Sequence, residues 1–159
     1  MTFDKKRNCI AAATFLVCVS LFLGCGSKKI TNEQIDTDIG NQALKVTEGS
    51  PSVWTFNADT DRCFAIAESK YSDGKAEITA RVASSQFDGQ EDARIEDVKS
   101  IKTLLGQIVL NYKSEGGKWV LEKAESKSLN AKAISPTDWK NTFVPIQLSL
   151  CDSYDHKKK

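Results

Sequence analysis

Histidine is nearly absent from this chain: among 159 residues the only one is His156, close to the carboxyl terminus. Histidine is the usual general base beside a serine or cysteine nucleophile, and it is the commonest metal ligand. The sequence also has no Gly-x-Ser-x-Gly, no Walker phosphate loop and no His-Glu-x-x-His pattern. We therefore expect no catalytic residue, no metal and no cofactor, and the sequence favours a protein that is not an enzyme.

The chain also lacks an excess of charge of one sign, since 22 Lys and Arg residues face 21 Asp and Glu residues. Proteins that bind nucleic acid carry a basic surface, so we expect no nucleic-acid partner.

A long hydrophobic run is missing as well. The longest, from Cys9 to Leu23, would span roughly 22 Å as a helix, less than the roughly 30 Å of a bilayer core. This length disfavours a permanent transmembrane helix.

That short run has informative flanks. Lys5, Lys6 and Arg7 precede it, and the segment Leu21-Phe22-Leu23-Gly24-Cys25 closes it. This arrangement resembles the signal peptide and lipobox of a bacterial lipoprotein, although Phe22 stands where that family usually has Leu. The resemblance implies that cleavage follows Gly24 and that lipid attached to Cys25 anchors the protein to a membrane. An uncleaved anchor and a plain secreted form are the alternatives.

The same features divide the chain into a signal peptide (1–24), a tether (25–30), a single domain (31–150) and a polar basic tail (151–159). Removing residues 1–24 leaves 19 basic and 20 acidic residues, so the formal net charge becomes −1. Gly26 stands where an inner-membrane retention signal would place Asp. The resemblance thus implies an extracytoplasmic envelope protein, held on the outer membrane if there are two membranes and otherwise on the outer leaflet of the cell membrane.

Two cysteines, Cys63 and Cys151, lie in the body of the chain, beyond Cys25 and the two in the signal segment. An even pair in an exported protein is typical of a disulfide. Both positions lie in segments with strand-like patterns, so they could meet across a sheet. Two buried free thiols are an equally good interpretation.

Hydrophobic periodicity predicts one helix followed by strands. Thr31 and Gln34 are spaced as in a capping box, and apolar residues recur at helical spacing as far as Val46, which predicts a helix over 32–45. The cleanest alternation of apolar and polar residues lies in 75–84, after the turn signal Ser72-Asp73-Gly74. We expect strands over 52–57, 62–71, 75–84, 104–113 and 118–126, an ambiguous segment at 128–134, a polar loop over 86–102, and a last edge strand over 143–150.

The predicted fold class is therefore α+β: an N-terminal helix packed on a curved antiparallel β-meander of four or more strands. Segments 72–82, 106–112 and 116–122 resemble small bacterial envelope proteins with cystatin-like or nuclear-transport-factor-like domains. Over 31–130, the resemblance implies a fold and, by analogy alone, a binding or scaffolding role.

Three tryptophans are candidates for ligand or partner contact. Trp119 alternates with Leu121, which favours core packing. Trp54 and Trp139 lie near turns and are the better candidates for exposed contacts.

Three functions fit the sequence. The first is a lipid-anchored, non-enzymatic binding or scaffolding module for an unknown envelope protein or peptide. The second is a carrier of a small lipid or aromatic ligand on the apolar sheet face. The third is a hydrolase using paired carboxylates, for which the sequence offers Asp59 with Asp61 and Glu91 with Asp92.

Overall fold

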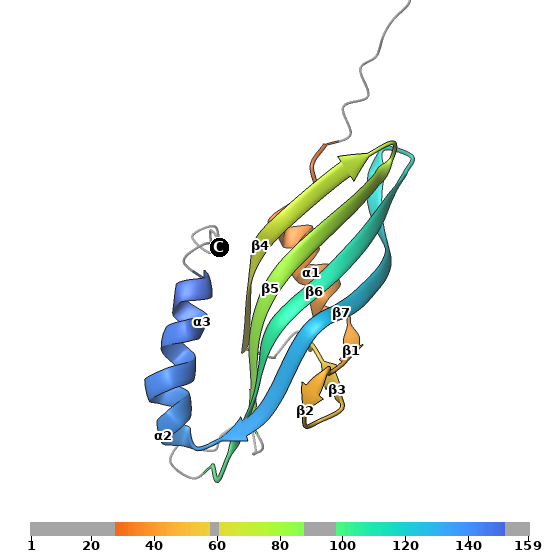
Figure 1. Ribbon diagram of the computed structural model, residues 1–159. Helices are drawn as coiled ribbons and strands as arrows, with labels where there is room; N and C mark the ends of the chain where they lie inside the picture. Colours follow the sequence, from red (N-terminus) through yellow and green to blue (C-terminus); the bar gives the residue numbers. More distant parts are fainter. Residues whose placement is uncertain (1–27, 58–60, 88–97, 152–159) are drawn as a thin grey trace, which may run out of the picture.

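A computed structural model describes residues 28–57, 61–87 and 98–151. The fold is α+β, with one large sheet between two layers (Figure 1). Four long strands follow one another as an antiparallel meander: β4 (Asp61–Ser72), β5 (Lys75–Phe87), β6 (Ile101–Glu115) and β7 (Lys118–Ile134). The expected polar loop is accordingly shorter, because β5 runs on to Phe87 and β6 starts at Ile101; its residues 88–97 lie outside the described ranges.

The sheet is mixed, so the expectation of a purely antiparallel sheet was wrong. The short strand β2 (Glu48–Gly49) pairs in parallel with β7 and gives the order β2-β7-β6-β5-β4. Gly49 makes this pairing feasible, because a Cβ built there would lie 1.8 Å from the Ala131 carbonyl oxygen. A residue that must approach another backbone so closely has to lack a side chain.

The N-terminal helix α1 (Asn32–Gly40) is shorter than the predicted 32–45. Thr31 caps its start as expected, since its side chain accepts a hydrogen bond from the Gln34 N–H (3.2 Å). Beyond Gly40 the period changes from helical to alternating: Leu44 is buried between exposed Ala43 and Lys45. These three residues form β1 (Ala43–Lys45), which pairs with β3 (Val53–Thr55). The apolar residues beyond Gly40 therefore belong to a strand.

The segment predicted as a last strand over 143–150 is helical. A continuous helical run consists of α2 (Pro136–Asp138), a π-helical turn (Trp139–Phe143) and α3 (Val144–Cys151). Ser135 caps it by accepting a hydrogen bond from the Asp138 N–H (3.1 Å), and Pro136 occupies the first turn, where its missing N–H costs nothing. The π-helical turn lies just before Pro145, whose ring disrupts a regular helix.

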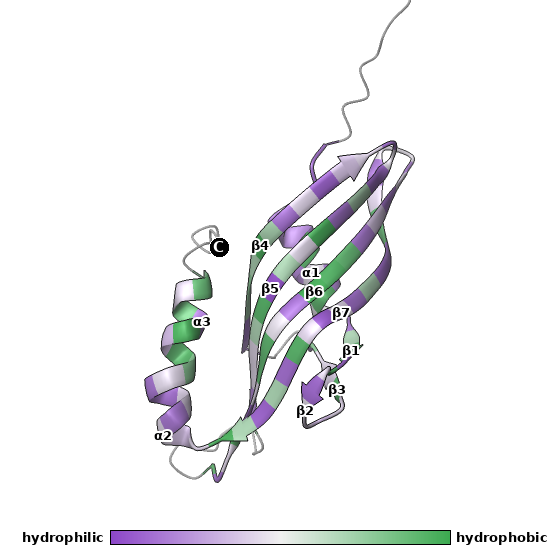
Figure 2. Ribbon diagram, viewed as in Figure 1, coloured by the Kyte–Doolittle hydropathy of each residue, from purple (hydrophilic) through white to green (hydrophobic). Residues whose placement is uncertain are grey.

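Different elements pack on the two faces of the sheet. On one, the α1 face, side chains of α1, β1 and β3 pack against alternate residues of the long strands and form the main apolar core. Cys63 alternates with core residue Phe64 along β4 and bonds to α3, so α3 lies on the opposite side, the α3 face. Figure 2 shows this alternation as changing hydropathy along the strands. The fully buried large side chains are Ile35, Ile39, Trp54, Phe56, Phe64, Ile78, Ile101, Leu104, Ile108, Leu110, Tyr112 and Leu129.

Candidate binding groove

An apolar groove lies between the C-terminal helical run and the α3 face. It has a volume of about 270 Å³, and its floor comes from Leu105 of β6 and Ile134 of β7. Phe143 and Ile146 form the helical wall, and Lys132, Asp138 and Thr142 supply its polar groups. The groove therefore combines an apolar floor with one positive and one negative side chain.

The helix beside this groove carries apolar side chains nearly all round. Phe143 is 2% exposed and anchors the run to the sheet, whereas Ile146 is 44% exposed and Leu148 is 59% exposed. Figure 2 shows the predominantly hydrophobic character of α3. Ile146 lines the groove, and an exposed apolar side chain beside an apolar groove is typical of interaction sites.

The surface of α3 that faces the sheet packs less well against it than the residues of the main core pack against one another. Gln147 points toward the sheet at 5% exposure, and its Nε2 has no hydrogen-bond partner. The α3 face offers small and polar buried residues there, including Ala83, Ser85 and Thr103. Burial of an unpaired amide costs free energy, so packing alone holds α3 weakly.

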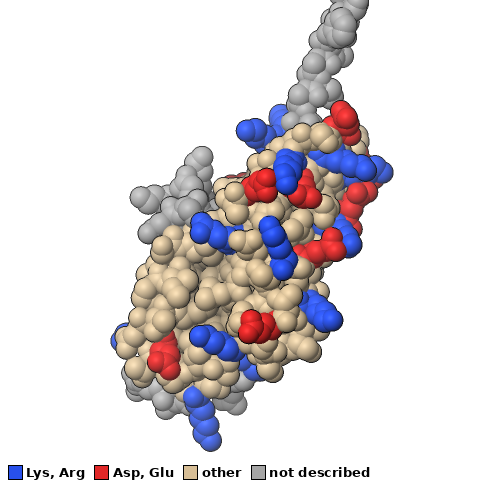
Figure 3. Space-filling model, in the orientation of Figure 1, with Lys and Arg blue, Asp and Glu red and all other residues tan. Residues whose placement is uncertain are grey.

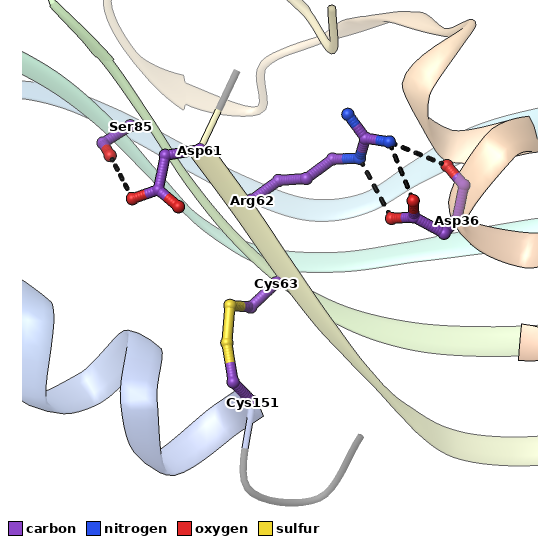
Figure 4. Close-up of a disulfide and its surroundings, with 6 residues drawn as sticks. All are labelled: Asp36, Asp61, Arg62, Cys63, Ser85 and Cys151. Atoms are coloured by element: carbon purple, nitrogen blue, oxygen red, sulfur yellow. Dashed lines mark hydrogen bonds and ion pairs between the residues drawn. A yellow bond between two sulfur atoms is a disulfide. The ribbon is translucent and has the colours of Figure 1, made fainter. Parts of the chain in front are cut away.

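A disulfide between Cys63 and Cys151 fixes the end of α3 to β4, with the two Cα atoms 5.5 Å apart (Figure 4). The bond joins a strand to a helix, so the expectation that both cysteines lie in strands was wrong for Cys151. The neighbouring Arg62 ties β4 to the other layer: its Nη2 lies 3.0 Å from Asp36 Oδ2 of α1. Adjacent residues of one strand thus hold elements on opposite faces.

The two tryptophans predicted as exposed contacts lie in different environments. Trp54 of β3 is 0% exposed and belongs to the main core, so the prediction was wrong for this residue. Trp139 is half-buried in the π-helical turn, and its ring meets Phe87 edge-on, with the ring centres 5.2 Å apart. Trp119 is 9% exposed in the core, as its alternation with Leu121 predicted.

Under α1, the Asp38 carboxyl lies beside the buried hydroxyl of Tyr112. Burial raises the pKa of Asp38 above its ordinary 3.8, and contacts with Tyr112 and Gln34 lower it in part. Burial, and then the Asp38 charge, raise the pKa of Tyr112. Even so, Asp38 Oδ2 and the Tyr112 hydroxyl have no hydrogen-bond partner of good geometry. The pair influences stability more readily than chemistry, because no second carboxyl joins it as a buried group among the described residues.

The other candidate groups do not come together in the described chain. Asp61 accepts a hydrogen bond from the Ser85 hydroxyl (3.2 Å), while Asp59, Glu91 and Asp92 lie outside the described ranges, as do Cys25 and His156. Across residues 28–57, 61–87 and 98–151, no cluster of three His, Cys, Asp or Glu side chains is present. No helix within these ranges has the length and apolarity to cross a membrane.

Fold and groove together define a small α+β domain with a disulfide-linked helix beside an open apolar groove. Comparison with family models, curated proteins and solved structures gave no match. The resemblances to a lipobox and to cystatin-like or nuclear-transport-factor-like domains therefore stay predictions.

The sequence contains a local signal for the helical run beside this groove. In Ser135-Pro136-Thr137-Asp138, a Ser followed by Pro and Asp is typical of a helix start. Had the following residues been assigned to a helix, the apolar Ile146 and Leu148 would have been predicted on a surface helix.

Proposed function

We propose that this protein is a lipid-anchored, non-enzymatic module of a bacterial envelope that binds an apolar segment of a protein or peptide partner. The observation that carries the proposal is Ile146, an apolar side chain that is 44% exposed and lines the groove of about 270 Å³. Full burial of such a side chain contributes about 1.5–3 kcal/mol. Ile146 is 44% exposed, so a partner that covers it gains roughly half of that amount.

The dimensions of the groove favour a partner side chain over an enclosed ligand. Sites for small molecules usually measure roughly 300–1,000 Å³ and surround most of the ligand. Lys132 and Asp138 at the groove fit the polar backbone and flanking charges of a peptide.

The other two functions have less support. A carrier using the apolar sheet face would need space there, but Ile35, Ile39, Trp54 and Phe56 fill that face at 0–1% exposure. A carboxylate hydrolase would need two carboxyls in one pocket, and among the described residues only Asp38 has a buried carboxyl oxygen without a hydrogen-bond partner. Neither is proposed.

Substitution on α3 tests the binding proposal. Ile146→Asp places a charge on the exposed apolar wall of the groove, and we expect at least a tenfold loss of affinity for a partner recovered from detergent-solubilised membranes. Val53→Asp is the matched control, because Val53 is 50% exposed on the α1 side, away from the groove. Equal loss in both variants, or recovery of the bait alone by the unaltered protein, would overturn the proposal.

Metabolic labelling with a fatty-acid analogue tests the anchor. We expect label on the unaltered protein and none on Cys25→Ala. An amino terminus that still begins at Met1, or an unlabelled Cys25, would contradict lipid anchoring without bearing on the groove.

A further inference from the structure

The N-terminal end of the described chain is fixed to one end of the sheet. The indole Nε1–H of Trp119, at the start of β7, donates a hydrogen bond to the Lys28 carbonyl oxygen. The Ile30 N–H donates to the Tyr71 hydroxyl near the end of β4 (3.3 Å), and Ile30 is 7% exposed in the core. The chain therefore enters the domain at this end and not at the groove (Figure 1).

Both β-hairpin turns lie at the same end, which we call the hairpin end: residues 28–30, 70–77 and 113–120. The β4–β5 turn at Asp73-Gly74 contacts β6, since the Ser114 N–H donates to the Gly74 carbonyl oxygen (2.7 Å). Gly116 and Gly117 form the β6–β7 turn, and they connect the last paired residues of the two strands, Glu115 and Lys118.

The distance from Cys25 to this end is short. Lys28 is three residue steps from Cys25, and a fully extended chain covers at most about 3.6 Å per step, or about 11 Å in all. If Cys25 carries lipid, Lys28 is then held within about 11 Å of the membrane surface.

Exposed lysines gather at the hairpin end. Lys70 pairs with Glu68 and Glu77, and Lys113 pairs with Glu115. Outside these ion pairs stand four more exposed lysines, Lys28, Lys29, Lys75 and Lys118, against one exposed acidic residue, Asp73. Figure 3 shows charged side chains concentrated toward this end and few over the part near α3.

We propose that the hairpin end docks on the anionic phospholipid headgroups of the anchoring membrane through Lys28, Lys29, Lys75 and Lys118, and that the groove points away from the membrane. This inference rests on the proposed lipid anchor at Cys25. Basic side chains within a Debye length of an anionic surface are attracted to it. From Glu115 to Leu105 the strand β6 covers ten residues, or roughly 33 Å, so the groove stands clear of the headgroups.

Fluorescence quenching by headgroup-labelled lipid tests the orientation. The full lipidated protein is reconstituted in vesicles of phosphatidylcholine with phosphatidylglycerol, with a small fluorescent amino acid at Val120 or at Leu148. Val120 is 44% exposed at the hairpin end, and Leu148 is 59% exposed on α3. We expect the Val120 probe to be quenched at least threefold more than the Leu148 probe. Equal quenching, or stronger quenching at Leu148, would overturn the orientation.

Charge reversal tests the lysines. We expect Lys75→Glu with Lys118→Glu to reduce quenching at Val120 by at least half in anionic vesicles and to leave it unchanged in pure phosphatidylcholine. Lys99→Glu with Lys140→Glu is the matched control, because both residues are exposed and lie outside the hairpin end. Equal effects of the two double variants would refute headgroup docking.

The intact mass of each sample separates the two proposals. An unmodified Cys25 overturns both the anchor and the orientation, whereas a lipidated Cys25 with equal quenching at the two probes overturns the orientation alone.

Discussion

At the scale of single residues, Asp38 is the clearest case of a side chain that the fold disfavours. Its carboxyl lies under α1 beside the Tyr112 hydroxyl, and burial raises its pKa above the ordinary 3.8. The folded state therefore prefers this carboxyl protonated, and its contribution to stability is lost as pH rises from 3.8 through the raised folded-state pKa.

Asp38→Asn removes this ionisation and keeps the shape of the side chain. We expect the variant to be more stable than the unaltered protein by roughly 1 kcal/mol at pH 7, because the amide carries no charge to desolvate. The difference should shrink as pH falls toward 3.8 and below. Urea unfolding at several pH values measures it, with exposed Asp73→Asn as control. A gain that does not change with pH would contradict the role assigned to the charge.

Gly106 shows a backbone constraint at the same scale. Its φ is +156°, and a Cβ there would lie 1.8 Å from the Ser128 carbonyl oxygen of β7. We expect Gly106→Ala to cost about 3 kcal/mol or more, since two neighbouring strands must separate. Gly116→Ala, in a turn where a Cβ meets nothing within 4 Å, should cost only about 1–2 kcal/mol through its φ of +57°. Equal losses in chemical denaturation would show that contact with Ser128 is unimportant.

At the scale of elements, the strands were easier to predict than the final helix. Lys75–Phe87 alternates because one face meets the core and the other meets α3 or water, and that pattern is visible locally. Segment 143–150 contains Val, Ile and Leu with no helical period, because α3 buries the polar Gln147 and exposes the apolar Ile146 and Leu148. Composition alone therefore favoured a strand, and only the cap at Ser135 indicated a helix.

The two helix caps allow the contributions of α1 and the C-terminal helical run to be compared. Thr31 caps α1, whose residues belong to the main core, and Ser135 caps the run outside that core. We expect Thr31→Ala to lower the global free energy of unfolding by about 1 kcal/mol. Ser135→Ala should lower it by clearly less and should instead speed amide exchange at 139–143. Denaturant unfolding combined with hydrogen exchange measures both effects. A larger loss of global unfolding free energy from Ser135→Ala than from Thr31→Ala would contradict this ranking.

At the scale of the whole molecule, the fold class was predictable and the groove was not. An α+β class follows from local periods, but the groove forms only when Leu105 of β6 packs beside residues 132–146, and no local pattern predicts that contact. The parallel pairing of β2 with β7 was hidden for the same reason, since Glu48–Gly49 is too short for any pattern. The Cys63–Cys151 pairing was one of two open interpretations, because the sequence could not place α3 over β4.

The main core and the C-terminal helical run should also differ in how readily they unfold locally. The main apolar cluster draws on α1, β1, β3 and the four long strands and includes no residue of the C-terminal helical run. That run is held by Phe143, by the disulfide and by an inner surface where Gln147 lacks a partner.

A disulfide stabilises chiefly by restricting the unfolded chain, by about 2–4 kcal/mol. We therefore expect a reductant to leave the sheet folded while amides of α3 lose protection against exchange at least tenfold. Hydrogen exchange with and without reductant, read separately for α3 and β5, measures this. Cys63→Ser with Cys151→Ser should reproduce the reduced pattern. Equal loss of protection in α3 and β5 would mean that the helical run belongs to the same cooperative unit as the core.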